Sequence, residues 1–190
     1  ISGSEAAAGL AQTFGVVGAA LLALPLARVA LSRGRRAALA GGYFLGSLGS
    51  VIVIVGAVYR SLAIVYAGCL FVGIASAAGL QARYAATDLA SANRRARSLS
   101  IVVWGATFGA VAGPNLLDVS GRWAQSLGLP PLAGPYLVAA VVCGVTVVLL
   151  LVFLRPDPYR ESLRLRGDVD PGVQRPRIRD GIEHLKNRPR

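Results

Sequence analysis

Few side chains of this chain could perform chemistry, and those few do not converge. Ser47 and Ser50 lie close together in sequence, but a serine nucleophile needs a base, and the one histidine is His184, far along the chain. Cys69 and Cys143 lie in separate apolar segments, where thiols usually serve packing rather than a disulfide or a metal. We therefore expect no enzyme, no metal site and no cofactor.

Five uncharged segments of about twenty residues dominate the rest of the sequence. They run over residues 6–27, 37–59, 61–82, 98–117 and 133–154. A helix of about 20 apolar residues crosses the hydrocarbon core of a bilayer, which is roughly 30 Å thick. Only a helix or a closed barrel satisfies its backbone in lipid, and these segments lack the alternation of barrel strands. The sequence predicts an all-α integral membrane protein, with a bundle of five transmembrane helices over 1–154.

Arginine clusters alternate from one side of these segments to the other. The stretches after the first, third and fifth segments include four arginines each, whereas the two opposite loops hold Arg60 and Arg122. Because cytoplasmic loops are enriched in Lys and Arg, we expect the N-terminus outside and the C-terminus in the cytoplasm. The net charge of +11 lies in these loops and the tail, which excludes nucleic acid as the expected partner. Nineteen arginines against one lysine indicate a GC-rich bacterial genome, hence a plasma (inner) membrane.

The sequence also allows predictions about the two ends of the chain. The chain has no methionine, and nothing before the first segment would carry the N-terminus outward, so we expect a fragment that lacks one upstream span. Residues 155–190 are expected to form a cytoplasmic linker. Within it, Ile178, Ile182 and Leu185 recur at the spacing of a short amphipathic helix over 177–187, and a disordered basic tail is the alternative.

The fourth segment contains a glycine repeat that ends in proline. Gly105, Gly109 and Gly113 are four residues apart, and Pro114 follows directly. Such glycines line one helix face and let another helix approach closely, while the proline can bend the helix. Ordinary close packing is one interpretation. The other is that the repeat resembles the antiporter motif in the fifth helix of the major facilitator superfamily, which bends that helix between two six-helix halves.

A second resemblance lies in the loop after the first segment. Gly34, Arg35 and Arg36 are similar to the end of the cytoplasmic loop motif between helices two and three of that superfamily. The family's acidic residue in this motif is replaced by Leu31, so Arg35 and Arg36 have the alternative role of anchoring the loop to anionic headgroups. The resemblance implies helices two to six of a six-helix half-bundle, followed by the central cytoplasmic linker.

Polar side chains at the ends of the third and fourth segments are the candidates for a working site. They are Gln81, Arg83 and Asp88 on the inner side and Asn115 on the outer side. Charges near the membrane core are costly and often functional, so gating or lining a cavity is one interpretation. For Arg83 the alternative is an orientation anchor, and for Asn115 it is a helix cap.

The resemblance implies secondary active transport of a small molecule by alternating access, in which two helical halves rock about a central site. The antiporter-like motif favours proton-coupled efflux, and a metabolite or sugar importer of the same superfamily is the alternative. A structural membrane protein without transport would need only the packing glycines. The implied partners are membrane lipid, a small-molecule cargo, a proton as coupling ion and the C-terminal half-bundle.

Overall fold

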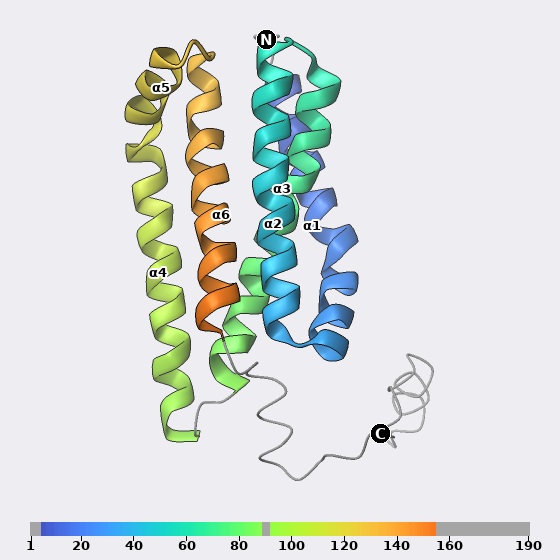
Figure 1. Ribbon diagram of the computed structural model, residues 1–190, viewed down its shortest axis with the longest axis vertical. Coiled ribbons are helices and arrows are strands. Elements are labelled where there is room, and N and C mark those ends of the chain that lie inside the picture. The colour runs from blue at the N-terminus through green and yellow to red at the C-terminus, as the bar shows by residue number, and fades with distance from the viewer. Residues whose placement is uncertain (1–4, 89–91, 155–190) are drawn as a thin grey trace.

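The computed structural model describes residues 5–88 and 92–154, and all regular secondary structure in this part of the chain is helical (Figure 1). Five of the helices are long and apolar enough to cross a membrane. In chain order the elements are α1 (Glu5–Arg33), α2 (Arg35–Val58), α3 (Leu62–Asp88), η1 (Ala92–Arg94), α4 (Arg95–Asn115), α5 (Leu117–Ser126), η2 (Pro131–Ala133) and α6 (Gly134–Phe153). The predicted all-α fold with five membrane-spanning helices is confirmed.

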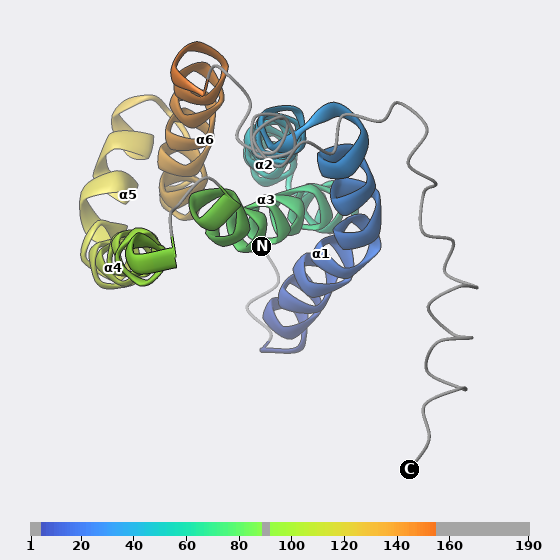
Figure 2. The ribbon, with the colours of Figure 1, turned by 90° about the horizontal axis from the view of Figure 1, so that it is seen from below.

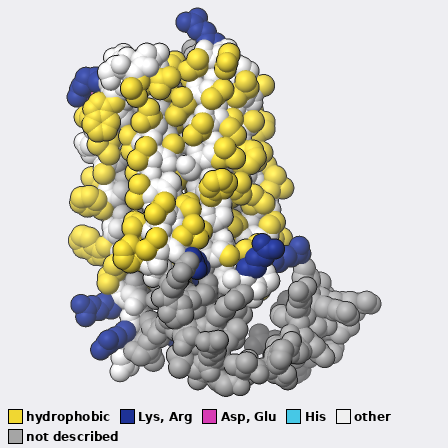
Figure 3. Space-filling model, in the orientation of Figure 1, with side chains coloured by type: hydrophobic (Ala, Val, Ile, Leu, Met, Phe, Trp, Pro, Cys, Tyr) yellow, Lys and Arg dark blue, Asp and Glu magenta, His cyan; other side chains and the backbone are white. Residues whose placement is uncertain are grey.

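The surface of the bundle is sorted along its length. Figure 3 shows hydrophobic side chains over the flank of the helices and arginine side chains near the two ends. Side chains of this kind on the flank are the ones that hydrocarbon accepts, because lipid cannot solvate polar groups. The arginines at the ends lie where headgroups and water would meet the protein.

Helix α1 runs further than its uncharged segment. It continues through Pro25 and past residue 27 to Arg33, so its last turns carry arginines. Proline is tolerated inside transmembrane helices because neighbouring groups and small local adjustments satisfy the freed backbone. The charged end of α1 is therefore a helical extension beyond the apolar segment and not a loop.

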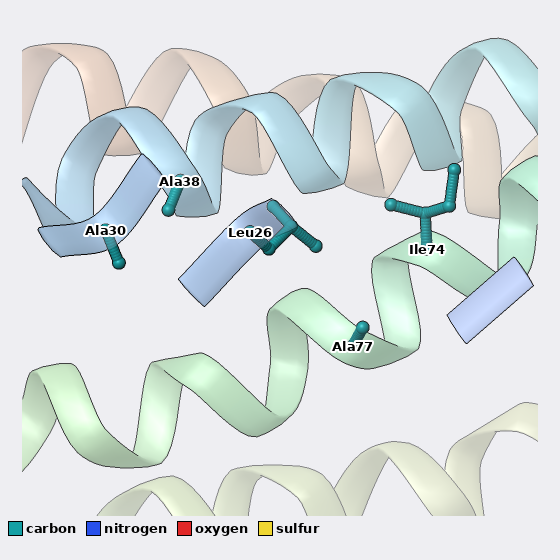
Figure 4. Close-up of a cluster of buried hydrophobic side chains, with 5 residues drawn as sticks. All are labelled: Leu26, Ala30, Ala38, Ile74 and Ala77. Atoms are coloured by element: carbon teal, nitrogen blue, oxygen red, sulfur yellow. The ribbon is translucent and has the colours of Figure 1, made fainter. Parts of the chain in front are cut away.

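Helices α1, α2 and α3 pack into one tight group. A buried cluster of Leu26, Ala30, Ala38, Ile74 and Ala77 joins all three helices (Figure 4). Three of these five side chains are alanines, so the helices approach closely without large interlocking side chains. Small residues at helix contacts are typical of membrane proteins, where van der Waals packing replaces the hydrophobic effect as the driving force.

The turn between α1 and α2 depends on one glycine. Gly34 is buried and has a φ of 97°, a conformation that L side chains rarely adopt. Its amide nitrogen donates a hydrogen bond to the Ala30 carbonyl oxygen at 3.1 Å, which closes the end of α1. The loop of the predicted arginine motif is thus reduced to a single residue, and α2 begins at Arg35.

Helices α4, α5 and α6 form a looser second group, to one side of α1–α3 in Figure 2. The segment boundaries predict a loop over 118–132, but α5 occupies most of it. This short helix buries Ser120, Gly121 and Ala124, three small residues whose spacing places them on one helix face. α6 also packs along α2, whereas α4 has no buried residue among those described.

Candidate functional site

A cavity of about 940 Å³ opens between α1, α2 and α3, with the start of α6 at its rim. Most of its lining is apolar and much of it is small, including alanines and glycines of α1. Polar atoms come from five lining residues, none of them charged: Gln12, Tyr66, Cys69, Ser76 and Tyr136. No residue in the described lining carries a charge. Pockets of roughly 300–1,000 Å³ with a few placed polar groups are typical small-molecule sites.

A close crossing of α1 and α3 positions the polar groups of the cavity. A Cβ atom built on Gly73 would overlap the backbone carbonyl of Gly15, so the two helices touch through their backbones there. Gln12 lies about one turn before Gly15 on α1, and Ser76 about one turn after Gly73 on α3. Both side chains are exposed to the cavity they line.

Tyr66 is held in the cavity wall by two contacts with α1. Its ring stacks on Phe14 with a centroid separation of 5.2 Å and an interplanar angle of 7°. Its hydroxyl donates a hydrogen bond to the Ala7 carbonyl oxygen at 3.5 Å. The wall therefore presents a fixed aromatic face beside neutral hydrogen-bonding groups, an arrangement that can bind an uncharged, partly apolar solute.

The inner ends of the helices form a second polar region around Arg35 and Arg36. Arg35 Nη1 donates a hydrogen bond to Gln81 Oε1 at 3.0 Å, and its guanidinium lies 5.9 Å from the centre of the Tyr84 ring. Arg36 Nη2 donates to the Leu151 carbonyl oxygen at 2.6 Å. The structure thus brings together Arg35 and Gln81, which the sequence placed in separate motifs.

The glycine repeat of α4 makes no close contact in the described structure. A Cβ atom built on Gly105, Gly109 or Gly113 would meet nothing within 4 Å among these residues. Gly109 and Gly113 line a crevice of about 290 Å³ whose other wall is α6, including Val138 and Ala139. Pro114 lies in the last turn of α4, which ends at Asn115.

Two other predicted site residues, Arg83 and Asn115, do not line the cavity. Arg83 is exposed on α3, and Asp88 ends that helix with its side chain outside the described part. Asn115 Nδ2 donates a hydrogen bond to the Val111 carbonyl oxygen at 2.7 Å, within its own helix. The segment 177–187 also lies outside the described residues.

Sequence reasoning missed several groups that the fold brings to the site. Tyr66, Ser76 and Tyr136 line the cavity, and the signal for Ser76 was its place one turn from Gly73, a glycine in the middle of a span. The Leu151 carbonyl oxygen that accepts the hydrogen bond from Arg36 is a backbone group. No residue type in the sequence could therefore have predicted this contact. Within the described residues there is no group of three or more His, Cys, Asp or Glu side chains that could hold a metal ion.

Comparisons with known proteins agree on one family. The family model of the Major Facilitator Superfamily matches residues 1–190. Two MFS-type transporters of Bacillus subtilis, YddS and YdeG, are 42% and 43% identical over 156 residues, which is 82% of this chain. The riboflavin transporter RfnT of Brucella anthropi is 32% identical over 148 residues, 77% of the chain. The chain spans 36% of the length of each of these relatives. No solved structure matches the chain.

Proposed function

Because the chain belongs to the major facilitator superfamily, we propose that it forms part of a transporter that moves a small molecule across a membrane by alternating access. The observation that carries this proposal is the cavity of about 940 Å³ between α1, α2 and α3, with its neutral polar groups. It has the size and the lining of a small-molecule site. Its position between membrane-spanning helices is where a carrier would hold its cargo.

The proposed transporter contains more helices than this chain provides. The exposed glycine face of α4, the crevice beside Gly109 and Gly113, and the lack of buried residues on the described α4 all support a further helix packed there. A sixth helix in this position would complete the half-bundle. A second half-bundle, joined through the linker over 155–190, would supply the other wall.

Proton-coupled efflux is the mode we propose first, on the strength of the antiporter-like repeat at Gly105, Gly109, Gly113 and Pro114. None of the nine acidic residues lies within the five candidate spans. A proton carrier would therefore come from a span end, such as Asp88 or Asp118, or from residues outside this chain. We propose an orientation with the N-terminus of the chain outside and its C-terminus inside. The arginine-rich ends of the helices then face the cytoplasm of a bacterial cell.

A relative supports a second candidate, transport of a riboflavin-like solute. One matched protein is named a riboflavin transporter, and the aromatic wall at Tyr66 together with neutral hydrogen-bonding groups suits a planar, uncharged ring system. Uptake of a metabolite or sugar by the same mechanism is the third alternative, because it is also a function of this superfamily. The three alternatives share the cavity and differ in cargo and direction.

Flux into proteoliposomes tests the proposal. The protein expressed from its complete gene is reconstituted, and riboflavin fluorescence inside the vesicles is followed with and without an imposed pH gradient. Flux that exceeds that of empty vesicles supports transport, and acceleration by the gradient supports proton coupling. A structural membrane protein would show no solute flux for riboflavin or for any member of a metabolite and drug panel.

A further inference from the structure

We infer that α5 lies along the surface of the membrane and that one apolar edge of this helix docks into phospholipid, at the boundary between headgroups and acyl chains. The edge consists of Val119, Trp123 and Leu127. The inference requires that the bundle spans a membrane. It depends neither on the cargo nor on which side of the membrane is the cytoplasm.

The chain passes from α4 into α5 through the single residue Leu116. Its amide nitrogen donates a hydrogen bond to the Ala112 carbonyl oxygen at 3.0 Å, and its carbonyl oxygen accepts one from the Ser120 amide at 2.8 Å. The 21 residues of α4 rise about 30 Å, which is the thickness of the hydrocarbon core. α5 therefore begins where α4 has reached the membrane surface, and Figure 2 shows it extending sideways from α4.

One side of α5 is packed against the bundle. Ser120, Gly121 and Ala124 are buried, and the helix contacts η2 and α6. A Cβ atom built on Gly134, the first residue of α6, would overlap the Ser120 carbonyl group, so the two helices touch through their backbones. This contact fixes the rotation of α5 and hence the direction in which its other sides face.

The remaining sides of α5 are sorted by polarity. Its exposed polar side chains share one side: Asp118, Arg122 and Gln125. Val119, Trp123 and Leu127 follow one another at intervals of four residues, so they share another side, between the polar side and the buried one. Trp123 and Leu127 are 58% and 64% exposed. The helix thus combines an open apolar edge with a polar side in contact with water.

Phospholipid is the occupant that fits this edge. A helix of this kind lies in the plane of the interface with its apolar side in the headgroup–acyl boundary, and tryptophan is enriched at that depth. Exposed apolar side chains also continue along the chain from α4 into α5, at Val111, Leu116 and Leu117. α5 contains one acidic and one basic residue, Asp118 and Arg122, so headgroup charge is not what holds it.

An interfacial α5 would fix the depth of the two spans that it joins. α6 contains no charged residue between Gly134 and Phe153, so its own side chains set its depth only weakly. α5 packs directly on the first residue of α6 and continues from the last turn of α4. Trp123 and Leu127, held at the interface, would therefore keep both spans in register with the bilayer.

Nitroxide labels placed one at a time on α5 test the depth of its sides. The protein expressed from its complete gene, with its native cysteines replaced, carries Val119→Cys or Leu127→Cys on the apolar edge, or Arg122→Cys or Gln125→Cys as the matched polar controls. In phosphatidylcholine nanodiscs, oxygen concentrates among the acyl chains and a nickel chelate stays in water. The ratio of oxygen to nickel accessibility should be at least about threefold higher at 119 and 127 than at 122 and 125.

Three results would overturn the inference. Equal nickel accessibility at all four positions would place α5 in water. Low accessibility to both reagents at 119 and 127 would show that protein, such as a further helix, covers the edge. Because α5 has no net side-chain charge, the contrast should be the same in phosphatidylglycerol nanodiscs, and a contrast confined to this anionic lipid would assign the binding to headgroup charge instead.

Tryptophan quenching tests the same edge with its native side chain. The fluorescence that is lost in Trp123→Phe belongs to Trp123, and lipids brominated near the headgroup should quench it at least about twofold more than lipids brominated near the end of the acyl chain. Trp104→Phe, in the middle of α4, is the matched control and should not show this preference. Unquenched Trp123 fluorescence in both lipids would contradict the docking. Neither measurement involves flux, so this inference and the transport proposal fail separately.

Discussion

Glycines recur in the first three helices and in α4, but their surroundings are opposite. A Cβ atom on Gly18 or Gly73 would overlap the backbone of the neighbouring helix, whereas one on Gly105 or Gly109 would meet nothing within 4 Å of the described residues. In α1–α3 the small residues are already used to bring backbones together. In α4 a glycine face is present without close contact to any helix among the described residues.

The α1–α3 contacts are complete within this chain, whereas the glycine face of α4 is where we propose that a further helix packs. The α1–α3 group has its own buried cluster, and its crossing at Gly15 and Gly73 sets the cavity wall. The described α4 has no buried residue and exposes large side chains such as Trp104 and Phe108. Single apolar side chains facing lipid need no partner, but a smooth glycine face is costly in a helix unless a backbone approaches it.

The largest effect is expected where the α1–α3 contact is tightest. Gly73→Ala places a methyl group against the Gly15 carbonyl, and backbone cannot move aside as a side chain can. We expect a loss of about 1–3 kcal/mol in stability, seen as a melting temperature lowered by several degrees in detergent. Gly41→Ala is the control, because its Cβ would meet nothing within 4 Å. Equal melting temperatures for the two variants would contradict the close crossing.

A smaller but more informative effect is expected on α4. In the protein expressed from its complete gene, Gly109→Leu should lower the stability by about 1 kcal/mol, seen as a lower melting temperature, because a leucine would separate α4 from the helix proposed to cover it. Ala110→Leu, next to it on α4, should be nearly silent. If neither variant changes the melting temperature, no helix packs on the glycine face in the whole protein. That result would contradict the further helix proposed beside α4.

The smallest effect is expected at the contact that joins the two regions. Ser47 on α2 donates a hydrogen bond to the Ala140 carbonyl oxygen of α6 at 2.9 Å. Ser47→Ala should cost about 0.6 kcal/mol, the average for polar contacts between membrane helices. Ser32→Ala removes a bond within a single helix and should change the melting temperature less. A reversed order would indicate that α6 is held to α2 by apolar packing alone.

The sequence was sufficient for the five spans because apolar length and charge position are local properties. It placed α2 and α6 within a few residues of their observed ends. It missed α5, because this ten-residue segment contains Asp118 and Arg122 and resembles a polar loop. The helix packs on α6 and η2, with Ser120, Gly121 and Ala124 buried. A short helix depends on its neighbours, which the local pattern does not contain.

The site was less accessible from sequence for the same reason. Arg35 and Gln81 are 46 residues apart and meet only because α2 and α3 are antiparallel neighbours. Arg36 donates its hydrogen bond to a backbone carbonyl, which the sequence pattern does not single out. The cavity forms only where three helices pack together. Glycine positions were the useful signal, but four-residue spacing alone did not distinguish the occupied face of α2 at Gly42 and Gly46 from the open face of α4.

Thiol labelling in intact cells tests the central claim, that the helices cross the membrane with Arg35 and Arg36 on the cytoplasmic side. Ser32→Cys and Ser126→Cys are introduced separately with Cys69→Ala and Cys143→Ala, since both new positions are exposed and lie at opposite ends of the bundle. A membrane-impermeant maleimide should label position 126 directly and position 32 only after permeabilisation. Direct labelling of position 32, or of both positions alike, would contradict the account.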